Sequence, residues 1–317
     1  MRIFITMLSA ILSNIIASVI FLNAAQAGST AEISFFTSIL NRDITYHVYI
    51  PTGWQAKRSY PVVYLLHGGS GGSPSDWFRL ADTTRILDGL IANGSIPPVV
   101  AIAPDGRAGH SSDAYTYYLN SMTGDYDWQR FFIEEFIPFV EPRFSNGGSA
   151  SRYVVGLSMG GFGAMTLLFQ HPALFTGGAA LSIGEFTPDQ ITSMPQADFN
   201  RRFGNSAGAD LIGNSRMQWH RLNSVVSRIA ALEQSAMVPT HRVFLACGTE
   251  DWLLDGTLEV HAALLRKGIK HGLHLSAGSH DWPYWKAILP MSLRFLMDTE
   301  LTTGEVTNLT TTVAHTP

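Results

Sequence analysis

One segment, YVVGLSMGGFG at residues 153–163, constrains the fold more than any other. A run of β-forming residues (153–155) meets a G-x-S-x-G sequence centred on Ser158, and a helix-capable apolar stretch (162–169) follows at once. This context gives the motif structural meaning, because the tight turn strains the serine while its glycines let strand and helix approach closely. We expect the Ser158 hydroxyl at the carboxyl edge of a sheet, above a helix N-terminus that favours developing negative charge.

Eight short runs along the chain have the composition of β-strands. Most are almost entirely apolar, which is typical of parallel strands that are buried on both faces. The first two runs flank Asn41-Arg42-Asp43, which predicts a hairpin. The runs are residues 33–40, 44–50, 60–66, 98–103, 152–155, 177–183, 241–246 and 272–275.

Helical patterns lie between these runs, with apolar residues at three- and four-residue spacing. Strands that alternate with helices imply right-handed crossovers and a mostly parallel sheet with helices on both faces. The sequence therefore predicts an α/β-hydrolase sheet of about eight strands, whose first pair is antiparallel. The helical patterns cover residues 77–92, 128–140, 159–170, 258–266 and 284–297.

The 317 residues divide into segments of different character. An apolar N-terminal stretch that ends in an A-x-A sequence predicts a signal peptide over 1–27 and a secreted or periplasmic protein, with an uncleaved membrane anchor as the alternative. Residues 28–300 form the predicted hydrolase domain. Within it, residues 185–240 fit no simple crossover and predict a helical insertion over the catalytic edge, or else a packing subdomain away from it. The Thr-rich tail, 301–317, is predicted to be disordered.

Charge, cysteine content and histidine spacing exclude several classes of protein. A formal net charge of -4 and a pI near 6.2 leave no basic face for nucleic acid. The one cysteine, Cys247, lies in an apolar run, and we expect it to be a small buried side chain. His271 and His274 would point to opposite faces of a strand and would not share one ion. We therefore expect no metal and no other cofactor.

The partners of the serine follow it in the order acid, then histidine, in this fold. Among the histidines downstream of Ser158, only His280 lies just past the end of the last predicted strand, in a run of small residues. The acid should follow the preceding strand, where Asp251 stands after a short turn, with Glu250 and Asp255 as rivals. Such an acid would hold the histidine tautomer and stabilise the imidazolium.

An oxyanion hole needs two N–H groups that are already oriented before the reaction. We expect the first from Met159, the residue after the predicted nucleophile. The second should come from the glycine-rich loop at residues 67–72, which reads HGGSGG. The Gly69 amide is preferred there, and Gly68 is the alternative.

Four segments of the chain resemble the esterase D-like family of α/β-hydrolases. That family includes feruloyl, acetyl-xylan and tributyrin esterases, S-formylglutathione hydrolases and mycolyltransferases. The resemblance spans about residues 60–290 and implies a catalytic triad of Ser158, Asp251 and His280. The segments are Tyr64-Leu65-Leu66-His67-Gly68 with Asp76-Trp77, Gly156-Leu157-Ser158-Met159-Gly160-Gly161, Cys247-Gly248-Thr249 with Asp251, and Gly278-Ser279-His280-Asp281-Trp282 with Trp285.

Together these features predict a secreted serine carboxylesterase that acts through an acyl-enzyme on a small-molecule or polysaccharide-linked ester. Four tryptophans lie next to the catalytic loops: Trp77, Trp252, Trp282 and Trp285. The first three are the main candidates for substrate contacts, with core packing as the competing interpretation. One alternative function is an acyltransferase, similar to the mycolyltransferases, that passes the acyl group to a carbohydrate. A catalytically inactive binding module is the alternative from another class.

Overall fold

The computed structural model describes residues 27–69, 71–109, 115–146, 148, 151–208, 210–233 and 241–298. The predicted signal peptide, except Ala27, and the predicted tail lie outside these residues, and both stay predictions. The division into one hydrolase domain with an insertion also stays a prediction.

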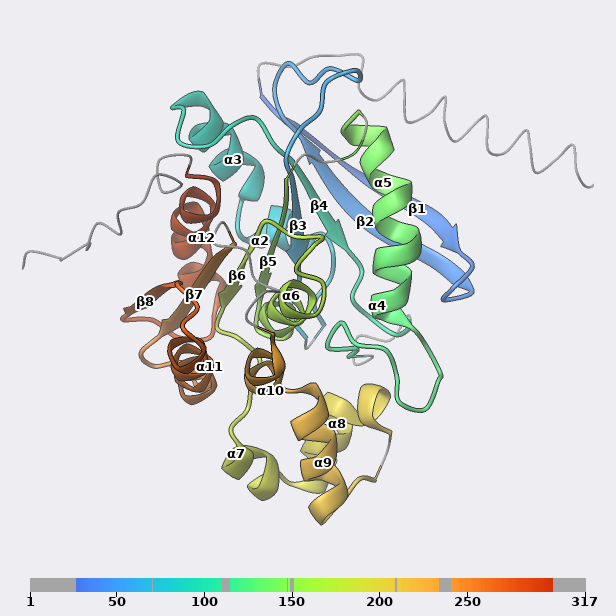
Figure 1. The fold of residues 1–317 in the computed structure, drawn as a ribbon. Coiled ribbons are helices and arrows are strands. Elements are labelled where there is room, and N and C mark those ends of the chain that lie inside the picture. The colour runs from blue at the N-terminus through green and yellow to red at the C-terminus, as the bar shows by residue number, and fades with distance from the viewer. Residues whose placement is uncertain are drawn as a thin grey trace, which may run out of the picture.

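An eight-stranded sheet runs through the molecule (Figure 1). Its strand order is β1-β2-β4-β3-β5-β6-β7-β8. β2 pairs antiparallel with both β1 and β4, and the other neighbours are parallel, which confirms the mostly parallel sheet with an antiparallel first pair. The strands are β1 (Ser29–Thr37), β2 (Arg42–Ile50), β3 (Val62–Leu66), β4 (Val100–Pro104), β5 (Arg152–Leu157), β6 (Gly177–Leu181), β7 (Arg242–Gly248) and β8 (Gly272–Ser276).

The position of each strand in the sheet explains its sequence. Every residue of β3, β4 and β6 is buried, because these strands lie inside the sheet with helices on both faces. β1 is an edge strand, and its half-buried residues alternate with exposed ones. The apolar pattern alone placed the start of this strand at residue 33, which is four residues late, because pairing with β2 continues through polar residues to Ser29.

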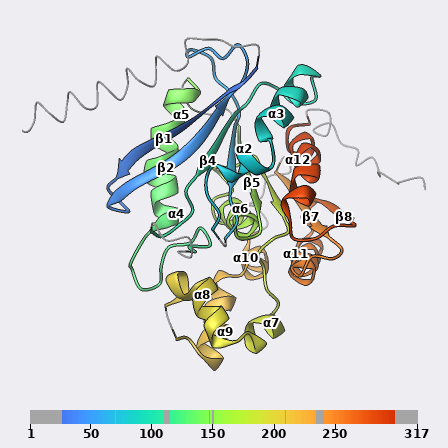
Figure 2. The ribbon, with the colours of Figure 1, turned by 180° about the vertical axis from the view of Figure 1, so that it is seen from behind.

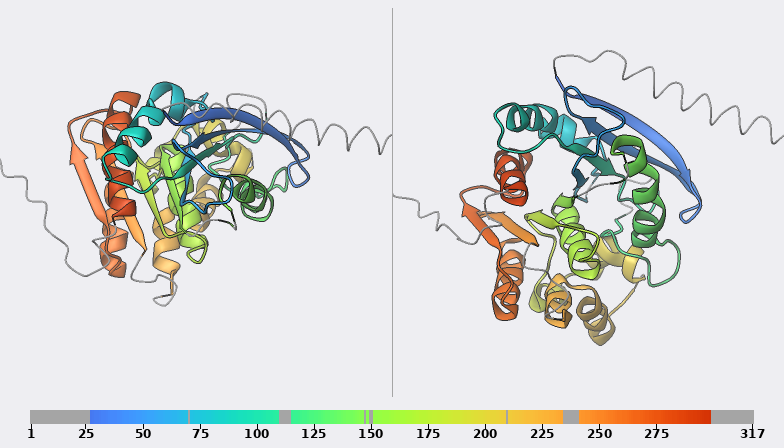
Figure 3. Two further views of the ribbon diagram at one scale, coloured as in Figure 1. Left: turned by 90° about the horizontal axis from the view of Figure 1, so that it is seen from above. Right: turned by 45° about the horizontal axis from the view of Figure 1, so that its top comes forward.

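Helices cover both faces of the sheet (Figures 2 and 3). α3 and α12 pack on the face that holds Val63 and Leu65, whereas α5, α6 and α11 pack on the face that holds Tyr64 and Leu66. The helices are α2 (Asp76–Leu80), α3 (Thr83–Ala92), α4 (Trp128–Phe131), the π-helical turn η1 (Phe132–Phe136), α5 (Ile137–Phe144), α6 (Met159–Gln170), α7 (Pro188–Ser193), α8 (Gln196–Ala207), α9 (Gly213–Asn223), α10 (Val225–Ala231), α11 (Leu254–Lys267) and α12 (Trp282–Met297).

Two predicted helices differ in detail from the observed ones. The helix predicted over 77–92 is two helices, α2 and α3, because Asp82 between them adopts a left-handed conformation with φ 57°. The helix predicted over 128–140 continues through α4, η1 and α5 to Phe144. It continues because Phe144 is buried on the same side as Val140, one turn earlier.

Between β6 and β7 the described residues form four helices, α7 to α10, and α7, α8 and α9 lie together at one end of the molecule (Figure 1). Phe199, Phe203 and Trp219 pack their rings together inside this segment. The ring of Phe186, just after β6, contacts both Phe203 and Trp252. These contacts join the helical segment to the loops at the carboxyl ends of the strands.

Candidate active site

Ser158 lies at the turn between β5 and α6. Its backbone is strained, with φ 54° and ψ -120°. The turn needs glycine on both sides, because a Cβ on Gly156 would lie 2.0 Å from the Gly160 carbonyl oxygen, and a Cβ on Gly160 would lie 2.1 Å from that of Leu66. The Ser158 N–H donates to the Leu181 carbonyl at 2.9 Å, which holds the turn against β6.

A chain of hydrogen bonds joins Ser158, His280 and Asp251. His280 Nε2 lies 3.0 Å from Ser158 Oγ, and His280 Nδ1 lies 3.1 and 3.0 Å from the two carboxylate oxygens of Asp251. The three side chains follow β5, β8 and β7, whose carboxyl ends lie at the same edge of the sheet. This arrangement can move a proton from a serine hydroxyl to an imidazole that a carboxylate orients.

The Asp251 carboxylate is buried and favours its charged form. Burial alone would raise its pKa, but hydrogen bonds from His280, Ser182 and a backbone N–H outweigh burial and lower the pKa below its ordinary value. Among the described residues, no carboxylate other than that of Asp251 bonds to His280. The rivals Glu250 and Asp255 are therefore not in place to orient this imidazole.

Two further residues, Ser182 and Trp285, support the histidine and its acid, and of these Ser182 was not predicted from the sequence. Ser182 adopts φ 51° directly after β6, and its hydroxyl bonds to Asp251. The indole N–H of Trp285 donates to Ser182 Oγ at 2.9 Å, and the Trp285 ring stands at 88° to the His280 ring with 5.0 Å between centroids. Together they fix the carboxylate and one side of the imidazole. Ser182 has no local motif that would have identified it.

The glycine-rich loop after β3 passes beside Ser158. A Cβ on Gly68 would lie 3.7 Å from Ser158 Cβ, and one on Gly69 would lie 3.0 Å from the ring of Tyr115. Met159 is the first residue of α6, so its N–H has no acceptor within the helix. Met159 and Gly68 thus border the nucleophile, and the role of the Met159 and Gly69 amides in stabilising an oxyanion is a proposal.

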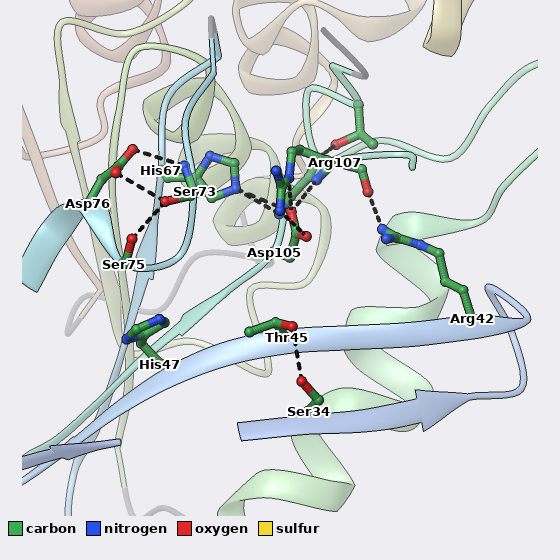
Figure 4. Close-up of polar contacts among 12 residues, drawn as sticks. Ser34, Arg42, Thr45, His47, His67, Ser73, Ser75, Asp76, Asp105 and Arg107 are labelled. Atoms are coloured by element: carbon green, nitrogen blue, oxygen red, sulfur yellow. Dashed lines mark hydrogen bonds and ion pairs between the residues drawn. The ribbon is translucent and has the colours of Figure 1, made fainter. Parts of the chain in front are cut away.

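The His67 side chain fixes the conformation of this loop. The Gly106 N–H donates to His67 Nε2 at 2.9 Å, so His67 Nδ1 carries the proton and donates it to the Gly68 carbonyl at 2.7 Å. Because the N–H and C=O of a trans peptide point in opposite directions, this bond turns the Gly69 N–H away from His67. Figure 4 shows His67 next to Asp105, whose carboxylate accepts two bonds from the Arg107 guanidinium, each 2.8 Å long.

The three tryptophans predicted as substrate contacts occupy different environments. Trp252 is 47% exposed, and its ring lies 4.9 Å from the His280 ring. Trp77 is fully buried, so the expectation that it contacts substrate is wrong: its side chain has no surface to offer. Trp282 is half-buried and packs edge-on against both Trp77 and Trp285. Its contact with substrate stays a prediction.

Glu185 is a buried carboxylate three residues after Ser182. One oxygen accepts from the Val225 N–H of α10 at 3.0 Å, and the other has no hydrogen-bond partner in the described part of the chain. Burial raises the pKa of this carboxyl to about 7. The preceding residue, Gly184, donates its N–H to the Ser158 carbonyl at 2.8 Å. Glu185 therefore connects α10 to the turn that carries the serine.

Three further features bear on metal binding, on membrane insertion and on the single cysteine. Within the described ranges, no three His, Cys, Asp or Glu side chains come close enough together to hold a metal ion. None of the helices in those ranges is both long and apolar enough to cross a membrane. Cys247 is buried in β7, and burial raises the pKa of its thiol to about 11. The absence of a cofactor stays a prediction.

A mostly parallel eight-stranded sheet with helices on both faces, and a serine at the sharp turn between β5 and α6, define an α/β-hydrolase. Residues 37–296 match the family described as "Putative esterase". The chain belongs to this family, as the sequence resemblance predicted.

Curated relatives have esterase names. An esterase of Mycobacterium tuberculosis is 31% identical over 271 residues, which cover 78% of this chain and 54% of the relative. An acetyl esterase of Caldicellulosiruptor saccharolyticus is 22% identical over 84% of this chain and 97% of its own length. An endo-1,4-beta-xylanase/feruloyl esterase of Xylanibacter ruminicola is 27% identical over 52% of this chain and 23% of its own. The matched region thus spans about half the length of the mycobacterial relative.

Solved structures share the fold. A ferulic acid esterase matches with a TM-score of 0.71 and 24% identity, covering 86% of this chain and 98% of that one. An S-formylglutathione hydrolase from Agrobacterium tumefaciens matches with a TM-score of 0.67 and 19% identity, over 87% and 97% of the two chains. At these identities the likeness establishes the α/β-hydrolase fold.

Proposed function

We propose that the chain is a secreted serine carboxylesterase that hydrolyses small-molecule or polysaccharide-linked esters through an acyl-enzyme on Ser158. The observation that carries this proposal is the unbroken hydrogen-bonded chain from Ser158 Oγ through His280 to the Asp251 carboxylate. The relatives named as an acetyl esterase and a xylanase/feruloyl esterase support ester substrates of these kinds. Export rests on the predicted signal peptide over 1–27.

In the first half of the reaction, Ser158 Oγ attacks the ester carbonyl carbon while His280 Nε2 takes the hydroxyl proton. The carbonyl oxygen becomes an oxyanion, which the amides of Met159 and Gly69 stabilise. Asp251 stays charged and stabilises the imidazolium. The imidazolium then protonates the leaving alcohol, and the acyl group remains on Ser158.

In the second half, a water molecule gives a proton to His280 and attacks the acyl-enzyme. The tetrahedral intermediate collapses, the carboxylic acid leaves, and Ser158 recovers its proton. A carbohydrate hydroxyl in place of water would make the enzyme an acyltransferase. Analysis of the products with and without a carbohydrate acceptor distinguishes the two reactions.

The Ser158→Ala substitution tests this proposal. It removes only the attacking hydroxyl, so the rate of hydrolysis of p-nitrophenyl esters should fall by about 10⁴-fold or more. The purified variant must retain the circular dichroism spectrum of the parent. Retention of more than a few per cent of parental activity would show that another residue is the nucleophile.

A further inference from the structure

Helix α8 places one cation beside the proposed catalytic histidine. The Arg202 guanidinium carbon, in α8, lies 4.9 Å from the ring centroid of Trp252. The Trp252 ring centroid lies the same distance, 4.9 Å, from that of His280. The distance from the Arg202 guanidinium carbon to the centroid of the His280 ring is therefore at most the sum of these two distances. A substrate bound at Ser158 lies within reach of the Arg202 charge.

Aromatic groups surround this guanidinium. It lies 5.5 Å from the ring of Phe186 and bonds to the hydroxyl of Tyr117. Burial raises the pKa of Tyr117 to about 12, so that hydroxyl is uncharged at neutral pH. No carboxylate in the described part of the chain lies within ion-pair distance of Arg202, although the charge of Asp198 acts on it from further away. Its neighbour Arg201, in contrast, pairs with Asp198 at 2.9 Å.

A half-buried guanidinium in this setting suits one class of ligand. Its planar array of N–H donors matches the two oxygens of a carboxylate, and aromatic rings on its faces leave the donor edges for such a bond. Trp252, which contacts both Arg202 and His280, is 47% exposed, so a bound molecule can reach its ring. An ester that carries a carboxylate a few bonds from its carbonyl could bind Arg202 while its carbonyl lies at Ser158.

We propose that Arg202 is a specificity-determining residue that binds a carboxylate on the substrate, so that the enzyme prefers anionic esters over neutral ones of the same shape. This inference rests on the proposed esterase function. The carboxylate can belong to the acyl part, as in a half-ester of a dicarboxylic acid, or to the alcohol part. The two sources share one chemistry and are separated by the choice of substrate.

Two matched substrate pairs test the proposal. Monoethyl glutarate and its neutral amide, ethyl glutaramate, differ only in the charge on the acyl part. Acetoxyacetate and acetoxyacetamide differ in the same way on the alcohol part. In at least one pair, the parent enzyme should show kcat/KM at least about tenfold higher for the anion. That preference should shrink as sodium chloride rises from about 0.05 M to about 0.5 M.

Substitutions in α8 test whether Arg202 causes the preference for anionic esters. Arg202→Gln should bring the anion-to-amide ratio close to one, and Arg202→Lys should retain part of it. The matched control is Arg201→Gln, which removes the same charge from the same helix and should keep the parental ratio. Each variant is first labelled with a fluorophosphonate probe, which reports a folded site.

The outcomes separate this inference from the proposed function. Hydrolysis of neutral esters without any preference for the anion in either pair overturns the role of Arg202 and leaves the esterase proposal standing. An equal loss of preference in the Arg201→Gln and Arg202→Gln variants also overturns it, because the effect would then be one of net charge. If the parent enzyme hydrolyses no ester, both proposals fail together.

Discussion

At the scale of single residues, the site depends on side chains whose ionisation is fixed by their neighbours. Asp251 keeps its charge inside the protein because donors from three directions outweigh the cost of burial. Ser182 then holds that carboxylate, and Trp285 constrains one side of the His280 imidazole. The chemistry proposed for Ser158 therefore depends on residues outside the triad as well as on its three members.

The choice of acid gives a prediction at this scale. Asp251→Asn should reduce kcat on the order of 10⁴-fold, because an amide favours the wrong histidine tautomer. The matched control is Asp255→Asn, at a position in the first turn of α11, and it should reduce kcat by less than about tenfold. Steady-state kinetics with p-nitrophenyl butyrate measures both. A reversed ranking would make Asp255 the acid.

At the scale of secondary-structure elements, the parallel strands bring distant residues to one edge. The positions of Ser158, Asp251 and His280 could be predicted because each directly follows an apolar strand, and the fold fixes the order of their roles. Arg202 and Tyr117 could not be predicted, because they come from a helix and a loop without a motif. Their approach to the site depends on the packing of α8 against the loop that follows β6.

Two helix glycines give opposite predictions at this scale. Gly89 in α3 has open space around it, so Gly89→Ala should raise the free energy of unfolding by about 0.5–1 kcal/mol. Gly163 in α6 has no such space, since a Cβ there would lie 2.4 Å from the Tyr118 ring. Gly163→Ala should lower the free energy of unfolding by about 1–3 kcal/mol. Urea denaturation measures both, and stabilisation by both substitutions would contradict this packing of Tyr118 on α6.

At the scale of the whole molecule, the helices between β6 and β7 are joined to the sheet by both aromatic and ionisable contacts. Phe186 contacts Trp252 and Phe203, while Glu185 accepts a hydrogen bond from the first turn of α10. A buried carboxyl at this junction makes the stability of the molecule depend on pH. The direction of that dependence follows from the pKa of Glu185.

The folded chain holds the Glu185 proton more tightly than the unfolded chain, because burial raises its pKa from 4.5 to about 7. Between these values the unfolded state releases the proton first, so this group destabilises the fold increasingly as pH rises and fully above about pH 7. Glu185→Gln should therefore unfold at a higher temperature than the parent at pH 8, with little difference at pH 5. The stabilisation should reach up to about 3 kcal/mol. Glu134→Gln, an exposed carboxylate, is the control.

Thermal unfolding of both variants and the parent at the two pH values decides this prediction. A Glu185→Gln variant that is less stable than the parent at pH 8 would contradict it. That result would mean that the charged form is the one the fold stabilises, through Val225 and the nearby Arg228.

The most direct measurement of the central claim is the mass of the enzyme trapped during turnover. The parent protein is mixed with a slowly hydrolysed p-nitrophenyl ester, quenched in acid within one turnover, and digested for peptide mass spectrometry. We predict one added acyl group, on the Ser158 hydroxyl of the peptide that contains residues 153–169, and none in Ser158→Ala. An acyl group on any other residue, or a burst of p-nitrophenol without an acylated peptide, would contradict it.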